Sequence, residues 1–384
     1  MEKLRTATLV APVAATVAGV LPAFLAGGLA VQISAELGVE EAAFGLAFAA
    51  YFATAAVGSV ALGRFAERVG ARTALVVAPL VSAGLQLGVA VGAHSYGVLL
   101  LLLALAGISN ALAQPAANLA LARVVPRDRQ GFAFGLKQSA IPICTMLGGL
   151  AVPVFAVGVG WRWAFVAGAA LAAFASLAAA VGPVGDPHQQ RAHPAIAPAP
   201  SRRVLAVLSL GIGLGGAAAG ALAAFLVSTG VEAGLSEGAA GAWLTVGSAF
   251  GLVVRLASGV AADRYPVRPL RVVVIMLAVG TPAFGALALG VSWLHCVATP
   301  LAFGAGWAWP GLFNLAVVRA FPAAPARATG VTQTGTYVGA VVGPLIFGVL
   351  AEHSYFVAWM VATGMLVASA IAMHLADRSL RMHG

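Results

Sequence analysis

The stretch Val254–Arg268 reads Val-Arg-Leu-Ala-Ser-Gly-Val-Ala-Ala-Asp-Arg-Tyr-Pro-Val-Arg. It begins inside an apolar run and leaves that run through a glycine, an acid and two arginines. A closely similar stretch lies 196 residues earlier, and other residues recur at the same offset. The matching pairs are Gly63 with Gly259, Arg68 with Arg264, Arg72 with Arg268, Glu36 with Glu232, and Asn118 with Asn314. Matches in one order and at one spacing predict a protein built from two copies of one plan.

The composition is that of an integral membrane protein. Hydrophobic residues make up 61% of the chain, charged residues make up 9%, and the mean hydropathy is +0.98. A chain with so little charge cannot cover itself with a water-facing surface. Its apolar runs are repeatedly about 20 residues long, which is the length that an α-helix needs to cross a bilayer. The runs lack the alternation of barrel strands, so the sequence predicts an all-α membrane protein.

The apolar runs predict twelve transmembrane helices in two bundles of six. The predicted ranges are 8–33, 43–62, 73–92, 97–122, 131–156, 163–182, 204–229, 239–259, 271–291, 296–318, 328–350 and 355–376. The connection at residues 185–203 is long, polar and rich in proline, which is typical of a flexible linker. The predicted domains are therefore an N-terminal bundle at 1–184, a cytoplasmic linker at 185–203 and a C-terminal bundle at 204–384.

The distribution of charge predicts the orientation in the membrane. If the amino terminus is cytoplasmic, every Lys and Arg except Lys137, Arg162 and Arg255 falls on the cytoplasmic side. This is a strong positive-inside bias, and it accounts for the net charge of +9 without a nucleic-acid partner. We expect both termini in the cytoplasm, a monomer, and a bacterial inner membrane, the last from an alanine-rich, lysine-poor composition. The other side receives Glu36, Glu40, Glu41, Glu232, Glu237 and Glu352.

The loop after the second predicted span, Gly63-x-x-x-Glu67-Arg68-x-Gly70-x-Arg72, resembles the loop signature of the major facilitator superfamily. The chain departs from that signature in having Glu67 for aspartate and Ala71 for a basic residue, and its second copy has Pro266 for the second glycine. The resemblance implies two pseudo-symmetric six-helix bundles, that is, the major facilitator fold, working by alternating access. It also implies gating by the two loops, although the loops could equally be solvated and serve topology alone. The gating candidates are Gly63, Glu67, Arg68, Arg72, Gly259, Asp263, Arg264 and Arg268.

Two cations, Lys137 and Arg255, lie within predicted spans, whereas all twelve acids lie in loops or at span ends. An ionisable residue at membrane depth is costly and usually functional. In proteins of the resembled family, the fifth and eighth spans lie beside the central cavity, which implies that both cations face a substrate. An anionic substrate would supply the missing charge, and arginine suits a carboxylate because its planar group can bind bidentately. The alternatives are that the side chains extend to the lipid headgroups or are buried against backbone carbonyls.

Other polar residues within the spans are candidate substrate contacts. Asn110, Gln114 and Asn118 recur every four residues and so share one helix face. Hydrogen bonds between helices are the alternative role for each polar candidate. The remaining candidates are Gln138, Gln333, Tyr337, Trp307, Asn314 and Tyr51.

Aromatic and histidine residues near the predicted outer ends have simpler expected roles. We expect Trp161, Trp163, Trp293 and Trp359 to anchor the chain at the membrane interface. His94, His295 and His353 are expected to be solvated or interfacial.

These residues together predict a secondary transporter of a small organic anion resembling a monocarboxylate. The position of Arg255, four residues before Gly259, is similar to that of the span-eight arginine in monocarboxylate transporters and the oxalate/formate exchanger. Proton symport and anion exchange (antiport) both fit a cationic site. An exporter of drug-like or hydrophobic molecules is the alternative. The sequence has no nucleotide-binding loop, clustered catalytic set or metal-ligand spacing, so we expect no enzyme activity, cofactor or metal.

Overall fold

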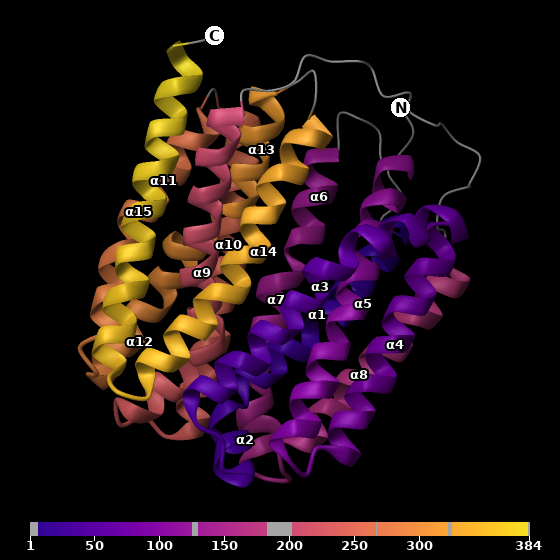
Figure 1. Ribbon diagram of the computed structural model, residues 1–384, viewed down its shortest axis with the longest axis vertical. Helices are drawn as coiled ribbons and strands as arrows, with labels where there is room; N and C mark the ends of the chain where they lie inside the picture. Colours follow the sequence, from indigo (N-terminus) through magenta and orange to yellow (C-terminus); the bar gives the residue numbers. More distant parts are fainter. Residues whose placement is uncertain (1–6, 125–129, 183–201, 266, 322–324, 383–384) are drawn as a thin grey trace. The chain divides into compact units, whose positions relative to one another are not determined.

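The computed structural model describes residues 7–124, 130–182, 202–265, 267–321 and 325–382, and these residues are nearly all helical (Figure 1). Twelve of the described helical segments are long and apolar enough to cross a membrane, which confirms the predicted all-α class. They cover Thr8–Gly28, Ala42–Ser59, Ala71–Gly92, Tyr96–Leu121, Gly135–Ala156, Arg162–Val181, Arg202–Glu232, Glu237–Ala262, Pro269–Leu287, Ser292–Ala320, Val331–Ala351 and Tyr355–Arg381.

The contacts divide the chain into two compact units. The first contains Met1–Val39 and Leu46–Ala192, and the second contains Glu40–Gly45 and His193–Gly384. The short segment Glu40–Gly45 belongs to the second unit, where the ring of Phe44 packs edge-on against that of Phe225. The predicted linker at 185–203 lies outside the described residues except for its last two, with which α9 begins.

The first unit differs from the predicted spans at two helix interruptions. The span predicted at 8–33 ends at Gly28, and a separate short helix follows it after Leu29. The fifth span is broken at Ser139 and ends in a π-helical segment. The elements are α1 (Ala7–Gly28), α2 (Ala30–Leu37), α3 (Glu41–Val69), α4 (Ala71–Gly92), α5 (Tyr96–Val124), α6 (Gln130–Gln138), α7 (Ala140–Ala151), η2 (Val152–Ala156) and α8 (Arg162–Val181).

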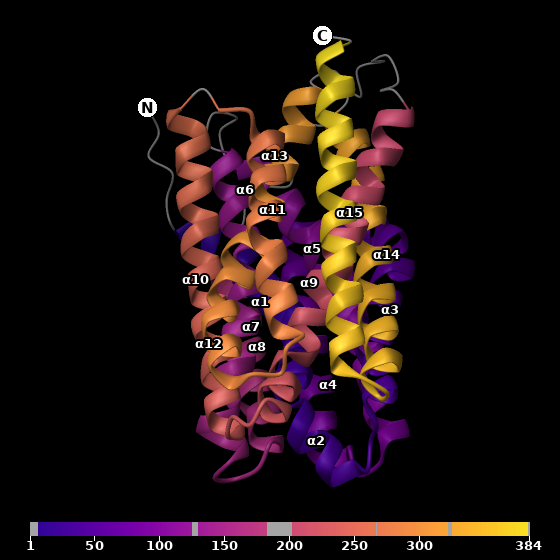
Figure 2. The same cartoon turned by 90° about the vertical axis from the view of Figure 1, so that its left-hand side faces the viewer.

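In the second unit, α11 lies beside α15 (Figure 2). The tenth span of this unit is also interrupted by a π-helical segment, at the position that follows α12. The helix α9 packs most extensively against α14 and then against α15. The elements are α9 (Arg202–Glu232), α10 (Glu237–Arg264), α11 (Pro269–Leu287), α12 (Ser292–Leu301), η3 (Ala302–Trp307), α13 (Pro310–Ala320), α14 (Pro325–Ala351) and α15 (Tyr355–Met382).

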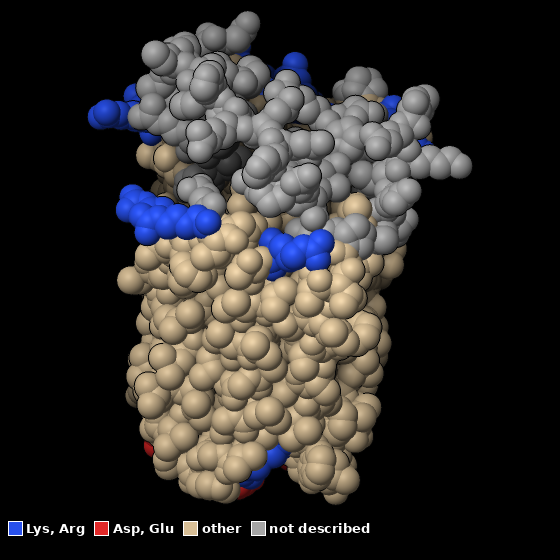
Figure 3. Space-filling model, turned by 90° about the vertical axis from the view of Figure 1, so that its right-hand side faces the viewer, with Lys and Arg blue, Asp and Glu red and all other residues tan. Residues whose placement is uncertain are grey.

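Charged side chains avoid the middle of the first unit. Figure 3 shows a broad face of this unit on which Lys, Arg, Asp and Glu lie only toward the two ends. The band between the ends has no charged side chain on this face, as expected where a helix bundle meets hydrocarbon.

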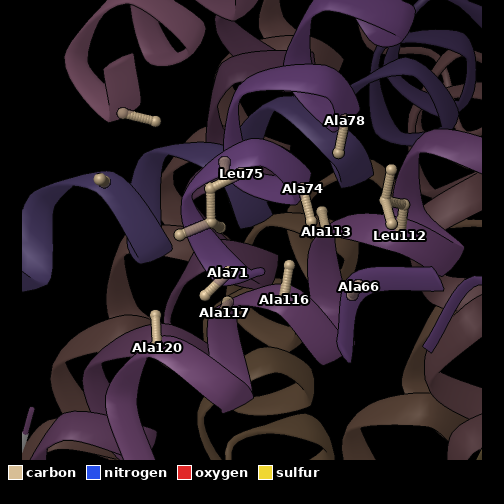
Figure 4. Close-up of a cluster of buried hydrophobic side chains, with 13 residues drawn as sticks. Ala66, Ala71, Ala74, Leu75, Ala78, Leu112, Ala113, Ala116, Ala117 and Ala120 are labelled. Carbon is tan, nitrogen blue, oxygen red and sulfur yellow. The ribbon is translucent and has the colours of Figure 1, made fainter. Parts of the chain in front are cut away.

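Small residues allow the helices of each unit to approach closely. One buried cluster, to which α1, α3, α4, α5 and α8 contribute, consists of alanines apart from Leu75 and Leu112 (Figure 4). In the second unit, Gly335, Gly339 and Gly343 form a stripe on α14. A Cβ atom added to any of the three would lie 2.1 to 2.2 Å from a carbonyl oxygen of α9. The two helices therefore touch backbone to backbone, which is how membrane helices pack without large apolar side chains.

Candidate functional site

The cation of the first unit, Lys137, lies at the end of α6 beside the break in the fifth span. Its side chain is buried, with 4% of the residue exposed, and its Nζ donates a hydrogen bond of 2.8 Å to Oδ1 of Asn118 on α5. Asn118 is itself exposed. The side chain therefore does not extend to the surface of its unit, and its bonding partner in the described residues is a neutral amide.

The polar stripe on α5 runs from the buried interior to the exposed surface of the first unit. Asn110 is buried, Gln114 is half-buried and Asn118 is exposed, and all three lie on one continuous helix. The Oδ1 atom of Asn110 has no hydrogen-bond partner among the described residues. Gln138, next to Lys137, is half-buried. The sequence therefore identified residues that share a face, and the structure shows that their access to a ligand differs.

Tyr51 lies in the core of the first unit. Its side chain is fully buried, and its hydroxyl donates a hydrogen bond to the carbonyl oxygen of Gly19 on α1. This contact is the interhelical hydrogen bond that was the alternative to a substrate contact. A substrate role for Tyr51 stays a prediction to which these contacts add no support.

The cation of the second unit, Arg255, lies on α10 and is also buried, with 7% of the residue exposed. Its Nη2 donates a hydrogen bond of 3.0 Å to the carbonyl oxygen of Trp307. That carbonyl ends the π-helical segment, directly before the break that precedes Pro310, a residue with no backbone N–H to donate. A helix break thus provides the oxygen that the guanidinium binds.

The other candidates of the second unit are partly accessible. Trp307, Asn314, Gln333 and Tyr337 are all half-buried, and Gln333 and Tyr337 lie one turn apart on α14. The ring of Trp307 packs at a tilt against Phe303, 5.4 Å between centroids. These residues could contact a solute without rearrangement of the core.

The first loop signature makes a tight turn between α3 and α4. Gly70 has a φ of 88°, a conformation that favours glycine. Arg72 is exposed, yet its Nη1 donates a hydrogen bond of 2.7 Å to the carbonyl oxygen of Ala180 in the last turn of α8. A cation at this position satisfies an unpaired helix carbonyl and complements the negative end of the helix dipole. Arg72 therefore stabilises its own unit.

The remaining gating candidates are less constrained. Arg68, Arg264 and Arg268 are exposed, and Gly63 and Gly259 are half-buried. The side chains of Glu67 and Asp263 lie outside the described part of the chain. Gating by these residues stays a prediction.

The comparison with protein families agrees with this architecture. The model of the Major Facilitator Superfamily matches residues 12–344. The chain belongs to this superfamily. It is accordingly an integral membrane protein and a transporter rather than an enzyme. Within the described residues, no cluster of three or more His, Cys, Asp or Glu could hold a metal ion.

Relatives of this superfamily member differ in what they carry. The chain is 28% identical to the chloramphenicol resistance protein of Streptomyces lividans over 381 residues, which cover 93% of this chain and 92% of that protein. It resembles the inward-facing, occupied structure of a bacterial homolog to the human lysosomal transporter Spinster, with TM-score 0.78, 16% identity and coverage of 98% of both chains. It also resembles the D-xylose-proton symporter, with TM-score 0.71, 16% identity and coverage of 95% and 96%. These likenesses establish the fold and leave the substrate class open.

The first unit of this superfamily member contains a charged cluster that was not predicted from the sequence. Arg162 at the start of α8 donates to Oε1 of Glu36 at 2.5 Å and to the carbonyl oxygen of Ala93 at 2.8 Å. Trp161 donates from Nε1 to Oε2 of the same glutamate at 2.7 Å. The Arg162 guanidinium lowers the pKa of the Glu36 carboxyl. The signal in the sequence was that Arg162 is the one cation placed among the outer acids.

The expected interfacial roles were wrong for two tryptophans and one histidine. Trp163 and Trp293 are exposed, but Trp161 and Trp359 are buried and donate hydrogen bonds, the latter to Thr229. His295 was expected to be solvated, and it is instead buried, with 1% of the residue exposed. Position near a span end did not show which side of the helix faces the protein.

Proposed function

We propose that the chain is a secondary transporter of small organic anions resembling monocarboxylates. Lys137 and Arg255 recognise the substrate. The observation that supports this proposal is a buried lysine held by the neutral amide of Asn118, in a chain whose acids all lie in loops or at span ends. A buried cation without a counter-charge is costly, and an anionic substrate offsets that cost when it binds.

Arg255 and Lys137 would bind a carboxylate substrate in different ways. The guanidinium of Arg255 is oriented by the Trp307 carbonyl and can present in-plane N–H donors along its edge to a carboxylate. The ammonium of Lys137 is a point charge that can exchange Asn118 for a substrate oxygen without a large movement. The half-buried side chains of Gln138, Gln333 and Tyr337 would then supply neutral hydrogen bonds.

Uptake into proteoliposomes tests this proposal. Radiolabelled formate, lactate and oxalate would be offered to the wild-type protein and to Lys137→Gln, Arg255→Gln and Arg255→Lys. The matched control is Arg271→Gln, which changes an exposed arginine of α11 outside the candidate site and gate. Loss of a charge-assisted hydrogen bond of about 1.5–3 kcal/mol should raise KM roughly 10- to 150-fold. Arg255→Lys should fall between the wild type and Arg255→Gln. Uptake of no carboxylate, or equal uptake by all four variants, would refute the anion site.

The same preparation distinguishes proton symport from anion exchange. A proton gradient directed into the vesicles should accelerate substrate uptake if the protein is a proton symporter. Unlabelled substrate inside the vesicles should accelerate it in an exchanger. We propose alternating access by one of these two routes, in a monomer whose termini are cytoplasmic in a bacterial inner membrane.

Export of drug-like molecules is the second candidate, favoured by the chloramphenicol resistance protein that the chain matches over nearly its whole length. Expression in a drug-sensitive bacterium tests it directly. Raised resistance to chloramphenicol that survives Lys137→Gln and Arg255→Gln would favour the exporter. Raised resistance that is lost in both variants would indicate that the site containing these two cations also exports the drug.

A further inference from the structure

His295 is a buried titratable residue that the proposed transport site does not use. It lies in the first turn of α12, with its imidazole inside the second unit. Neither Nδ1 nor Nε2 has a hydrogen-bond partner among the described residues. A neutral imidazole always carries one N–H, so burial without a partner leaves a donor unsatisfied. The unsatisfied imidazole therefore destabilises the described arrangement, and a change that exposes the ring to a hydrogen-bond partner would remove this cost.

The imidazole is held against the last turn of α9. A Cβ atom added to Gly230 would lie 3.0 Å from Nε2 of His295 and 3.0 Å from the Cβ of Ala240 on α10. A side chain at position 230 would therefore require the ring or Ala240 to shift by a few tenths of an ångström. The last turn of α9, which leads into the α9–α10 turn, thus packs directly against His295, and the glycine at position 230 permits that close approach.

The carbonyl groups of that last turn already accept other hydrogen bonds. The oxygen of Gly230 accepts from Leu235 at 2.9 Å, and the oxygens of Thr229 and Val231 accept from Ala233 and Gly234 at 2.9 Å. Gly234 has a φ of 92°, so the chain ends α9 in a tight, glycine-dependent cap. The His295 ring thus packs against the end of α9, where the hydrogen bonds of the helix cap already occupy these carbonyl oxygens.

Counter-charges for a protonated His295 lie only at the exposed edge of this region. On the elements that pack against it, the titratable groups at this end are Glu232 of α9, which is exposed, and Glu237 of α10, which is half-buried. The described parts of α11 and η3 carry no titratable group at this end, because Arg271 and Arg255 lie farther along α11 and α10. Cys296 is the neighbour on α12 itself. No ion pair joins the ring to either carboxylate among the described residues.

We propose that His295 is a proton-binding site whose occupancy opens the α9–α10 turn. In the arrangement described, the ring is neutral and buried. Protonation creates a charge that the enclosed position cannot stabilise, so the proton favours an arrangement in which the turn is released and the ring meets water or Glu232. The closed turn is therefore stable at neutral pH and is lost as the pH falls through the range in which exposed histidine titrates. This inference does not depend on the substrate class.

Hydrogen exchange on the full chain in lipid nanodiscs, without substrate, tests the proposal. An exposed imidazole binds its proton near pH 6.5, so the opening equilibrium should increase about tenfold between pH 7.5 and 5.5. The readout is exchange at the amides of Ala233–Leu235, corrected for the intrinsic effect of pH. His295→Leu and His295→Asn should remove this pH response, whereas His353→Leu, which changes an exposed histidine of the same unit, should keep it.

A second variant tests the packing separately. Gly230→Ala should raise exchange at both pH values, because the added Cβ requires the ring or Ala240 to shift. A wild-type protein whose turn does not respond to pH would overturn the proposal. A response that persists in both His295 variants would overturn it equally, by assigning the effect to the glutamates of the turn.

Discussion

At the scale of single residues, the two cations within spans each donate a hydrogen bond to a neutral oxygen. Lys137 and Arg255 stand out because no acid shares their depth in the sequence. Their partners, the Asn118 amide and the Trp307 carbonyl, lie 19 and 52 residues away along the chain. The Trp307 carbonyl lies at a break in the α-helical pattern, which apolar periodicity does not reveal.

Asn118→Asp should weaken anion binding. A carboxylate at the position of Oδ1, now 2.8 Å from Nζ of Lys137, would neutralise the lysine permanently and compete with the substrate. Loss of about 1.4 kcal/mol of charge-assisted binding corresponds to a tenfold higher KM. Asn118→Ala removes the amide without adding charge and should change KM less. Equal KM values for the wild type and the aspartate variant would contradict a role for the lysine charge.

The Glu36–Arg162 pair should make stability depend on pH. Because Arg162 lowers the folded-state pKa of Glu36, the pair stabilises the protein fully above the unfolded pKa of about 4.3 and loses this effect as the pH falls through the folded value. The pair is partly exposed, so its contribution should be at most about 1 kcal/mol. The Tm difference between the wild type and Glu36→Gln should be constant above about pH 5.5 and shrink below about pH 4.5. A similar profile for Glu232→Gln, the equivalent in the repeat, would argue against the pair.

At the scale of elements, small residues determine how closely helices pack. The sequence shows many glycines, but only the structure separates those at a contact from those on an open face. Gly339 would place a Cβ atom 2.1 Å from the carbonyl oxygen of Gly213, whereas Gly364 on α15 would meet nothing within 4 Å. The difference depends on which helix lies opposite.

Gly339→Ala should therefore destabilise the protein by about 1–3 kcal/mol, since α9 and α14 must separate to admit the methyl group. Gly364→Ala should be neutral or stabilising by up to about 1 kcal/mol, because alanine has the higher helix propensity. Thermal unfolding in detergent compares the two variants. Equal Tm values would show that α9 and α14 do not touch backbone to backbone.

Two arginines at the turn between α3 and α4 should affect different properties, one the stability of the protein and the other its transport rate. Arg72→Ala loses the hydrogen bond to the Ala180 carbonyl and should cost about 1 kcal/mol of stability. The exposed Arg68→Ala should leave the Tm unchanged and slow transport if the loop acts as a gate. Both are measured on the purified variants, as Tm and as uptake rate per folded protein. An unchanged uptake rate in Arg68→Ala would leave this arginine a role in topology alone.

At the scale of the whole molecule, the sequence repeat relates two units whose buried side chains differ. The offset of 196 residues relates their loop signatures, yet the buried charges differ: Lys137 lies just before a helix break, and Arg255 lies within a continuous helix. The Glu36–Arg162 pair has no equivalent in the second copy, where Ala358 occupies the position matching Arg162. Equivalent segments thus preserve the helical plan while their side chains serve each unit separately.

Labelling of single cysteines should test the predicted orientation. In a background in which Cys144 and Cys296 are replaced by serine, Arg264→Cys should react with a membrane-impermeant maleimide only from the cytoplasmic side. Ser354→Cys, in the short turn before α15, should react only from the opposite side. Intact cells and inverted vesicles give the two exposures. The reverse pattern would overturn the positive-inside assignment.

The sequence by itself determined the membrane class, the number of spans, the duplication and the presence of two embedded cations. These properties follow from composition and from patterns along one segment, so they need no knowledge of neighbours. The tertiary structure alone decided that His295 and Trp359 are buried, that Tyr51 bonds to α1, and that Arg162 holds Glu36. Each of these depends on which residue faces another across a helix contact, and the apolar patterns that specify a span are nearly uniform around it. The sequence therefore determines where a residue lies along a span, whereas the helices packed around that span determine what its side chain faces.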